Sequence, residues 1–166
     1  DLWLRENQLT GQIPREMGNM VSLDYLVLSH NHLVGQIPES IYGLPVLRAL
    51  WLDFNELSGE ISHEICKMPE LIQLYVNTNR LGGAFPNCMC GLDIPYGGWQ
   101  WFFHVWQNQF CPPYPGCLEG SICDGLGEFG EVFMDVSNCP QPESDIYVNQ
   151  CVMMNDCYPC SIWNED

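Results

Sequence analysis

The chain has 166 residues, 46% of them hydrophobic, which is long enough for one domain with a packed core. Its 15 glycines and 12 prolines exclude a bundle of long helices, and no run approaches the roughly 18 apolar residues of a membrane span. A formal net charge of -16 opposes nucleic-acid phosphates and anionic lipids, so we expect no nucleic-acid partner and no membrane insertion.

Charge is distributed unevenly along the chain. Residues 1–90 hold all five arginines and lysines together with ten acidic residues, whereas residues 91–166 hold eleven acidic residues and no arginine or lysine. Such a surface permits cationic partners, or divalent cations such as calcium. The simpler interpretation is a solvated acidic face that keeps the protein soluble.

One frame recurs at an offset of 24 residues through the N-terminal half of the chain. Each copy has an asparagine, with a large apolar residue three positions before it and two positions after it. The asparagines are Asn7, Asn31, Asn55 and Asn79. We expect a short strand before each one, around residues 2–4, 26–28, 50–52 and 74–76. Repetition at a period of 20 to 29 residues indicates units that cannot bury their apolar side alone and therefore stack into a solenoid.

The asparagines are expected to have a structural role. Each side chain can hydrogen-bond backbone groups of its own turn and of the neighbouring turn, so the four would form a buried ladder. The glycine that follows in each copy allows a tight turn, and the next Ile-Pro begins the return segment.

The segments Gly11-Gln-Ile-Pro14, Gly35-Gln-Ile-Pro38 and Gly83-Ala-Phe-Pro86 complete the pattern LxxLxLxxNxLxGxIP. This pattern resembles the plant-type leucine-rich repeats of receptor ectodomains, secreted inhibitor proteins and algal cell-surface proteins. The third copy departs from it with Ser62 at the proline position. The resemblance implies an α/β solenoid with a short parallel β-sheet on the concave face and loops and 3-10 turns on the convex side. It also implies an extracellular or cell-surface setting, and a concave sheet that recognises a protein or peptide.

Alternation along the strands predicts which side chains lie outward on the concave face. One outward column is Trp3, Val27, Trp51 and Tyr75, and the next is Arg5, Ser29, Asp53 and Asn77. Aromatic residues suit strands in general, but Tyr, Trp and Arg also dominate binding hot spots. We therefore hypothesise a binding surface centred on Trp51. Its predicted members are Trp3, Tyr25, Trp51, Asp53, Phe54 and Tyr75.

The 24-residue frame fails after Leu92, because its next copy would need an asparagine at Phe103. We therefore expect a solenoid of about four repeats at 1–92, and an irregular, acidic, disulfide-rich C-terminal cap at 93–166. The aromatic stretch 99–106 covers the open core as a helical turn or a strand, or forms a carbohydrate or partner site. Alternation predicts cap strands at 132–136 and 146–148. The ending resembles the cysteine-rich caps of secreted algal leucine-rich-repeat proteins.

Ten cysteines favour disulfides and an oxidising compartment. A zinc site or a redox pair at Cys157-Tyr-Pro-Cys160 is the alternative, but no regular Cys/His spacing supports zinc and no βαβ pattern surrounds the pair. Cys66 and Cys90 occupy the same place in consecutive coils, about 5 Å apart, so we predict a Cys66–Cys90 bridge with Cys88 as the rival. The other cysteines are left unassigned.

The first coil has nothing stacked before it. Its core residues are Leu2, Leu4, Leu9 and Ile13, and residues 1–22 contain no cap. We expect further repeats before Asp1, or another chain over this face.

No catalytic motif is present, so we expect neither an enzyme nor a bound cofactor or metal. His30 and His32 flank Asn31 and should point to opposite sides of the turn, a poor start for a shared metal. The sequence therefore predicts a non-enzymatic interaction module with a protein or peptide partner. The second hypothesis is a structural component of an extracellular assembly, such as a wall, filament or surface coat, that self-associates through its solenoid ends and cap.

Overall fold

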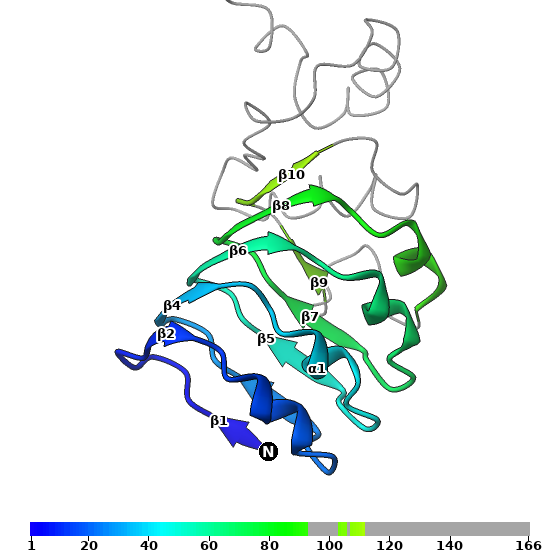
Figure 1. The fold of residues 1–166 in the computed structure, drawn as a ribbon, viewed down its shortest axis with the longest axis horizontal. Helices are drawn as coiled ribbons and strands as arrows, with labels where there is room; N and C mark the ends of the chain where they lie inside the picture. Colours follow the sequence, from blue (N-terminus) through cyan, green and yellow to red (C-terminus); the bar gives the residue numbers. More distant parts are fainter. Residues whose placement is uncertain (93–102, 106, 112–166) are drawn as a thin grey trace, which may run out of the picture.

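The structure is a computed structural model that describes residues 1–92, 103–105 and 107–111. Stacked coils run from the N-terminus upward in Figure 1, and each coil contributes one strand to each of two parallel sheets. The first sheet consists of β1 (Leu2–Trp3), β3 (Tyr25–Val27), β5 (Ala49–Trp51), β7 (Gln73–Tyr75) and β9 (Phe103–His104). The second sheet consists of β2 (Thr10–Gln12), β4 (His32–Gly35), β6 (Glu56–Glu60), β8 (Arg80–Ala84) and β10 (Gln109–Cys111).

The first sheet follows the sequence frame directly. Its register pairs Leu2 with Leu26, Ala49 with Gln73 and Leu50 with Leu74, so equivalent residues of consecutive coils lie side by side. This confirms the expected parallel sheet on the concave side.

The second sheet was not anticipated from the repeat frame. It forms just after each asparagine turn, and its strands pass through the repeat glycine in a left-handed conformation. Gly59 has φ of 83°, and a Cβ there would lie 2.7 Å from Cγ of Gln36 in the preceding coil. Glycine therefore serves two purposes here: it accepts the positive φ and lets the neighbouring side chain lie flat on the sheet.

Short helices form the convex side, each a single turn. They are η1 (Arg15–Asn19), α1 (Glu39–Tyr42), η2 (His63–Lys67) and η3 (Asn87–Gly91). Proline precedes three of them, where its fixed φ suits a helix start. Ser62 replaces proline before η2 with almost the same φ of -64°, and its hydroxyl accepts a hydrogen bond from the backbone N–H of Glu64. The departure from the repeat pattern is therefore structurally neutral.

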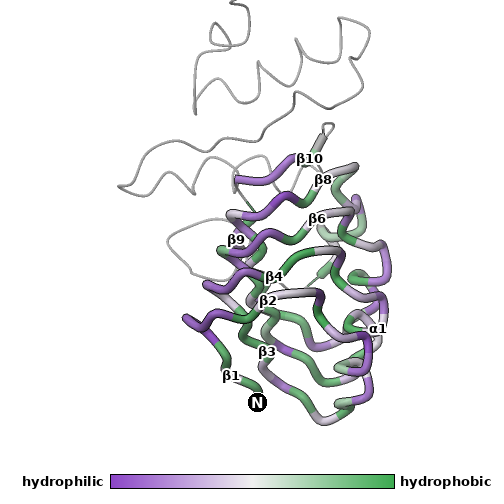
Figure 2. The backbone as a smooth tube through the Cα atoms, turned by 60° about the vertical axis from the view of Figure 1, so that its left-hand side comes forward, coloured by the Kyte–Doolittle hydropathy of each residue, from purple (hydrophilic) through white to green (hydrophobic). Residues whose placement is uncertain are grey.

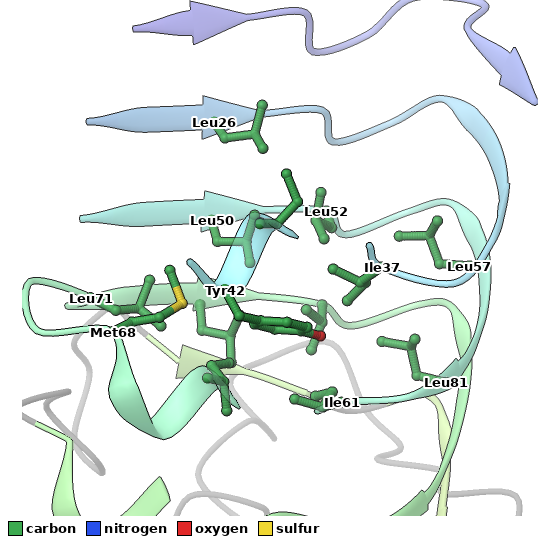
Figure 3. Packing of buried hydrophobic residues seen from close by; sticks show 14 of the residues in the cluster. Leu26, Ile37, Tyr42, Leu50, Leu52, Leu57, Ile61, Met68, Leu71 and Leu81 are labelled. Atoms are coloured by element: carbon green, nitrogen blue, oxygen red, sulfur yellow. The ribbon is translucent and has the colours of Figure 1, made fainter. Parts of the chain in front are cut away.

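The core lies between the sheets and the short helices. Leu50 of the first sheet, Ile37 of the return segment and Met68 beside η2 all point into this interior (Figure 3). The turns that join the two sheets are hydrophilic, as the purple edge in Figure 2 shows. No helix in the part of the chain that the structure describes is long and apolar enough to cross a membrane.

The asparagine ladder is confirmed. Asn55 accepts a hydrogen bond from the backbone N–H of Leu33 at 3.0 Å, and its amide donates to the carbonyls of Leu28 and Leu52 at 3.1 and 3.0 Å. One side chain thus joins three backbone groups in two coils.

A fifth coil continues the solenoid past Leu92, where we expected the repeat to end. Strand β9 pairs with β7 and strand β10 pairs with β8. Asn108 takes the ladder position: its Oδ1 accepts from the N–H of Leu81, and its amide donates to the carbonyl of Val76. The offset from Asn79 is 29 residues instead of 24, which is why a fixed period missed it. The expected cap strands at 132–136 and 146–148, and the pair Cys157 and Cys160, lie outside the described residues.

The predicted Cys66–Cys90 bridge is wrong in this structure. Cys66 is joined to Cys88, the rival partner, with 5.8 Å between their Cα atoms. Equivalent positions of successive coils have parallel Cα–Cβ bonds, so side chains at a 24-residue offset run side by side instead of toward each other. The bridge still joins η2 to η3, so it does connect two consecutive coils as expected.

The first coil is less buried than those that follow. Leu2, Leu4 and Leu9 are partly buried against the core, whereas Ile13 is fully buried. The expectation of a covering element over this face stays a prediction.

Candidate binding surface on the concave face

Parallel pairing lines up one outward residue from each coil of the first sheet. Trp3 pairs with Val27, Val27 with Trp51, Trp51 with Tyr75, and Tyr75 with His104. The predicted column is therefore present, and the fifth coil extends it by a residue that the sequence frame did not find.

The rings on this face contact one another in a continuous run. Five residues form it, named here the aromatic row: Trp3, Tyr25, Trp51, Tyr75 and His104. Trp51 stacks on Tyr75 with ring centroids 4.8 Å apart, and Tyr75 stacks on His104 at 4.4 Å. Trp3 stacks on Tyr25 at 5.9 Å and meets Trp51 edge-on at 5.6 Å. Such ring pairs are worth about 0.5 to 1.5 kcal/mol each beyond their buried area, so the row orders itself.

Stacking changes which of these residues meet solvent. Val27 has no exposed surface, because it lies between Trp3 and Trp51 in the column and their two indoles close over it. Trp51 and Tyr75 are half-buried, whereas Trp3 keeps 54% of its surface exposed. The expectation of a fully exposed aromatic column is therefore corrected to a packed row with an exposed end.

The second predicted column is buried, not exposed. Ser29, Asp53 and Asn77, named here the polar strip, are 0%, 8% and 3% exposed. The Ser29 hydroxyl donates a hydrogen bond of 2.5 Å to Oδ1 of Asp53. Arg5 is exposed, and its Nε pairs with Glu6 at 3.1 Å. The strip is therefore a set of buried polar groups beside the aromatic row.

A second ring pair lies on the other side of the strip. His30 stacks on Phe54 with centroids 4.2 Å apart, and Nε2 of His30 lies 3.9 Å from Oδ2 of Asp53. Both residues precede a ladder asparagine and have positive φ of 55° and 52°, a conformation held by the turn. Phe54 is 42% exposed, so this predicted site residue does face solvent.

Burial keeps the aromatic row uncharged near neutral pH. It raises the pKa of Tyr75 to about 12, with a smaller contribution from the negative charge of Asp53. It also lowers the pKa of His104 to about 4. The row can therefore supply apolar and ring contacts, and Trp51 has its indole N–H already bonded to Oε1 of Gln73 at 3.0 Å. Among the described residues, no group of three or more His, Cys, Asp or Glu could hold a metal ion.

Sequence reasoning missed His104, His30 and Gln73 as members of this surface. For His104 a signal existed: Val105, Asn108 and Phe110 repeat the apolar, asparagine, apolar spacing of the frame. His30 and Gln73 are found only from contacts between coils.

Comparison with known proteins agrees with this architecture. The family model of the leucine-rich repeat matches residues 22–44 and 46–68. The BIR2 ectodomain from Arabidopsis thaliana is 34% identical, with a TM-score of 0.64 over 71% of this chain and 59% of that one. The BIR3–SERK2 complex from Arabidopsis thaliana is 33% identical, with a TM-score of 0.63 over 71% of this chain and 61% of that one.

A larger protein shows the same likeness. The plant peptide hormone receptor RGFR1 in complex with RGF2 is 33% identical, with a TM-score of 0.62 over 69% of this chain. The chain spans only 18% of the length of that receptor. A search of curated proteins found no match. The fold is therefore a leucine-rich-repeat solenoid, similar to the extracellular domains of plant receptors.

Proposed function

We propose that this chain is a non-enzymatic interaction module of a secreted or cell-surface protein, and that it binds a protein or peptide partner on its concave face. Likeness to RGFR1, which is described as a peptide hormone receptor in complex with RGF2, supports a peptide or protein as the ligand class. The Cys66–Cys88 disulfide supports an oxidising compartment.

The aromatic row is the observation that carries this proposal. It holds Trp51 at its centre, contacted by Trp3 on one side and Tyr75 on the other. Trp and Tyr are enriched among the few residues that supply most of the binding energy at interfaces. The row is already packed before a partner arrives, so little side-chain entropy remains to be lost on binding.

Replacing Trp51 with alanine tests the site. We expect the affinity for the native partner to fall by about 2 kcal/mol or more, which is roughly a thirtyfold rise in Kd. Trp51 is half-buried, so the change should also lower the free energy of unfolding by about 1 to 2 kcal/mol through lost ring contacts. Binding should be measured by titration calorimetry well below the thermal midpoint of the variant.

The matched control is Val46→Ala, which trims an apolar side chain that is 41% exposed before β5, outside the aromatic row. It should leave affinity unchanged. Equal affinity of folded Trp51→Ala and wild-type protein would move the binding site away from the concave face.

The second hypothesis, a structural component of an extracellular assembly, stays a prediction. Its test is the mass in solution by light scattering over a range of concentrations. A concentration-dependent rise in mass would favour assembly through the solenoid ends.

A further inference from the structure

We propose that the polar strip, Ser29, Asp53 and Asn77, receives the guanidinium group of an arginine side chain presented by the bound partner. This inference rests on the proposed function and names the chemistry of one contact within it. It goes beyond the aromatic row because it assigns a specific charged ligand group to buried residues.

Asp53 is a buried carboxylate without a cation of its own chain. Its one hydrogen bond comes from the Ser29 hydroxyl, and the nearest ring nitrogen of His30 is 3.9 Å away. The sequence contains five arginines and lysines in all, and each of them pairs with a different carboxylate. The pairs are Arg5–Glu6, Arg15–Glu16, Arg48–Asp24, Lys67–Glu64 and Arg80–Glu56. A buried carboxylate is costly unless it is paired, so an external cation would relieve that cost.

Asn77 supplies a second and independent observation. Its side chain is 97% buried by the 3% exposure above, and its Oδ1 has no hydrogen-bond donor. It neighbours Asp53 in the strip, because the N–H of Phe54 donates to the carbonyl of Asn77 across the two coils. A buried acceptor without a donor costs about 1 to 3 kcal/mol, which a donor from a partner would offset.

The shape and chemistry of the neighbours favour arginine over lysine. By register, the strip runs between the stacked rings of Trp51 and Tyr75 and the stacked rings of His30 and Phe54. A guanidinium is planar, lies well against aromatic rings and carries five donors in a fork that can reach two acceptors at once. Lysine offers a strongly hydrated point charge that loses more on entering such a place. The net charge of -16 would also attract a basic segment over a distance.

Two small compounds test the inference directly on the full 166-residue chain. N-acetyl-arginine-methylamide carries the guanidinium, whereas N-acetyl-citrulline-methylamide has nearly the same shape without the charge. In nuclear magnetic resonance titrations we expect the arginine compound to shift the side-chain amide of Asn77 and the indole N–H of Trp51. Citrulline should bind about tenfold or more weakly, and the lysine analogue should lie between them. No shift with arginine, or equal shifts with citrulline, would overturn the assignment.

Asp53→Asn provides the second arm, since it removes the charge and keeps the shape. The arginine compound should lose about tenfold in affinity for this variant, whereas Glu60→Gln, at an exposed acid in β6, should leave it unchanged. Circular dichroism checks that both variants are folded, and the wild-type comparison decides the matter if Asp53→Asn is not.

The outcome also separates this inference from the proposed function. Loss of the native partner in Trp51→Ala, combined with no preference for arginine over citrulline, would keep the concave site and refute its basic ligand. Retention of the partner in Trp51→Ala would refute the proposed site itself.

Discussion

A ladder asparagine does more for this fold than its size suggests. Asn31 and Asn55 each bond three or more backbone groups, and those groups belong to two neighbouring coils. Removing one such side chain leaves several buried N–H and C=O groups without partners. The stability of the stack therefore depends on polar residues as well as on leucines.

Asn55→Ala should lower the free energy of unfolding by about 3 kcal/mol, because three hydrogen bonds to buried backbone groups are lost. Asn7→Ala is the matched control. Asn7 is exposed and bonds only the carbonyls of Leu4 and Arg5 in its own coil, so about 1 kcal/mol or less is expected. Urea denaturation of both variants measures the difference, and equal losses would show that the ladder contributes nothing beyond its local turn.

His104 makes stability depend on pH. Burial lowers the pKa of His104 to about 4 in the folded protein, whereas the unfolded side chain takes up its proton near 6.5. Between these values the unfolded chain binds more protons, so the His104 contribution is complete above pH 6.5 and is lost as the pH falls to about 4. Allowing for the partial exposure of the ring, we expect about 1 to 2 kcal/mol over this window.

His104→Gln should flatten this part of the curve of unfolding free energy against pH. His32→Gln, at an exposed side chain in β4, should leave the curve as it is in the wild type. If the two variants lose the same pH dependence, burial of His104 is not the cause.

Among the structural elements, the short helices of the convex side are tied by the disulfide between η2 and η3. Cys66 and Cys88 enclose 22 residues of sequence separation, a loop for which a disulfide typically contributes about 3 kcal/mol. Cys88→Ser should therefore lower the free energy of unfolding by about that amount.

Cleavage with cyanogen bromide identifies the pairing, because Met68 and Met89 separate the three cysteines into different peptides. Without reduction, the peptide containing Cys66 should remain joined to the one that ends at Met89. A peptide that joins Cys66 to Cys90 would restore the pairing expected from the repeat and contradict the structure.

Across the whole molecule, the solenoid depends on its fifth coil. Phe110 has no exposed surface and packs edge-on against Phe85 with centroids 5.0 Å apart. Val105 and Asn108 are also buried, so this coil covers the core of the fourth. Residues past Leu92 thus belong to the repeat stack as well as to any cap that follows.

Phe110→Ala should cost about 3 to 5 kcal/mol of unfolding free energy, the usual range for truncating a buried phenylalanine. Val34→Ala removes a side chain that is 39% exposed in β4, and it should cost far less. Thermal or urea unfolding gives both values. A neutral Phe110→Ala would place the end of the stack at Leu92, where the 24-residue period stops.

The sequence determined the parts of this protein that repeat. Spacing within one coil is covalent and local, so Leu50, Asn55 and Ile61 predict strand, turn and return segment without knowledge of any neighbour. The parallel first sheet, the asparagine ladder and the leucine core follow from that spacing. The choice of aromatic residues on the concave face could also be read from alternation along the strands.

Tertiary structure decided what depends on contacts between coils. Val27 is outward by alternation yet buried, because indoles from the coils on either side meet over it. Asp53 lies in an outward column yet is enclosed by its neighbours, and Cys66 pairs with the cysteine whose Cβ points toward it instead of the one in register. The fifth coil returns at a longer offset that periodicity could not detect. A period fixes where a residue stands in its own coil, whereas burial, ring stacking and disulfide pairing depend on side-chain directions in the adjacent coils.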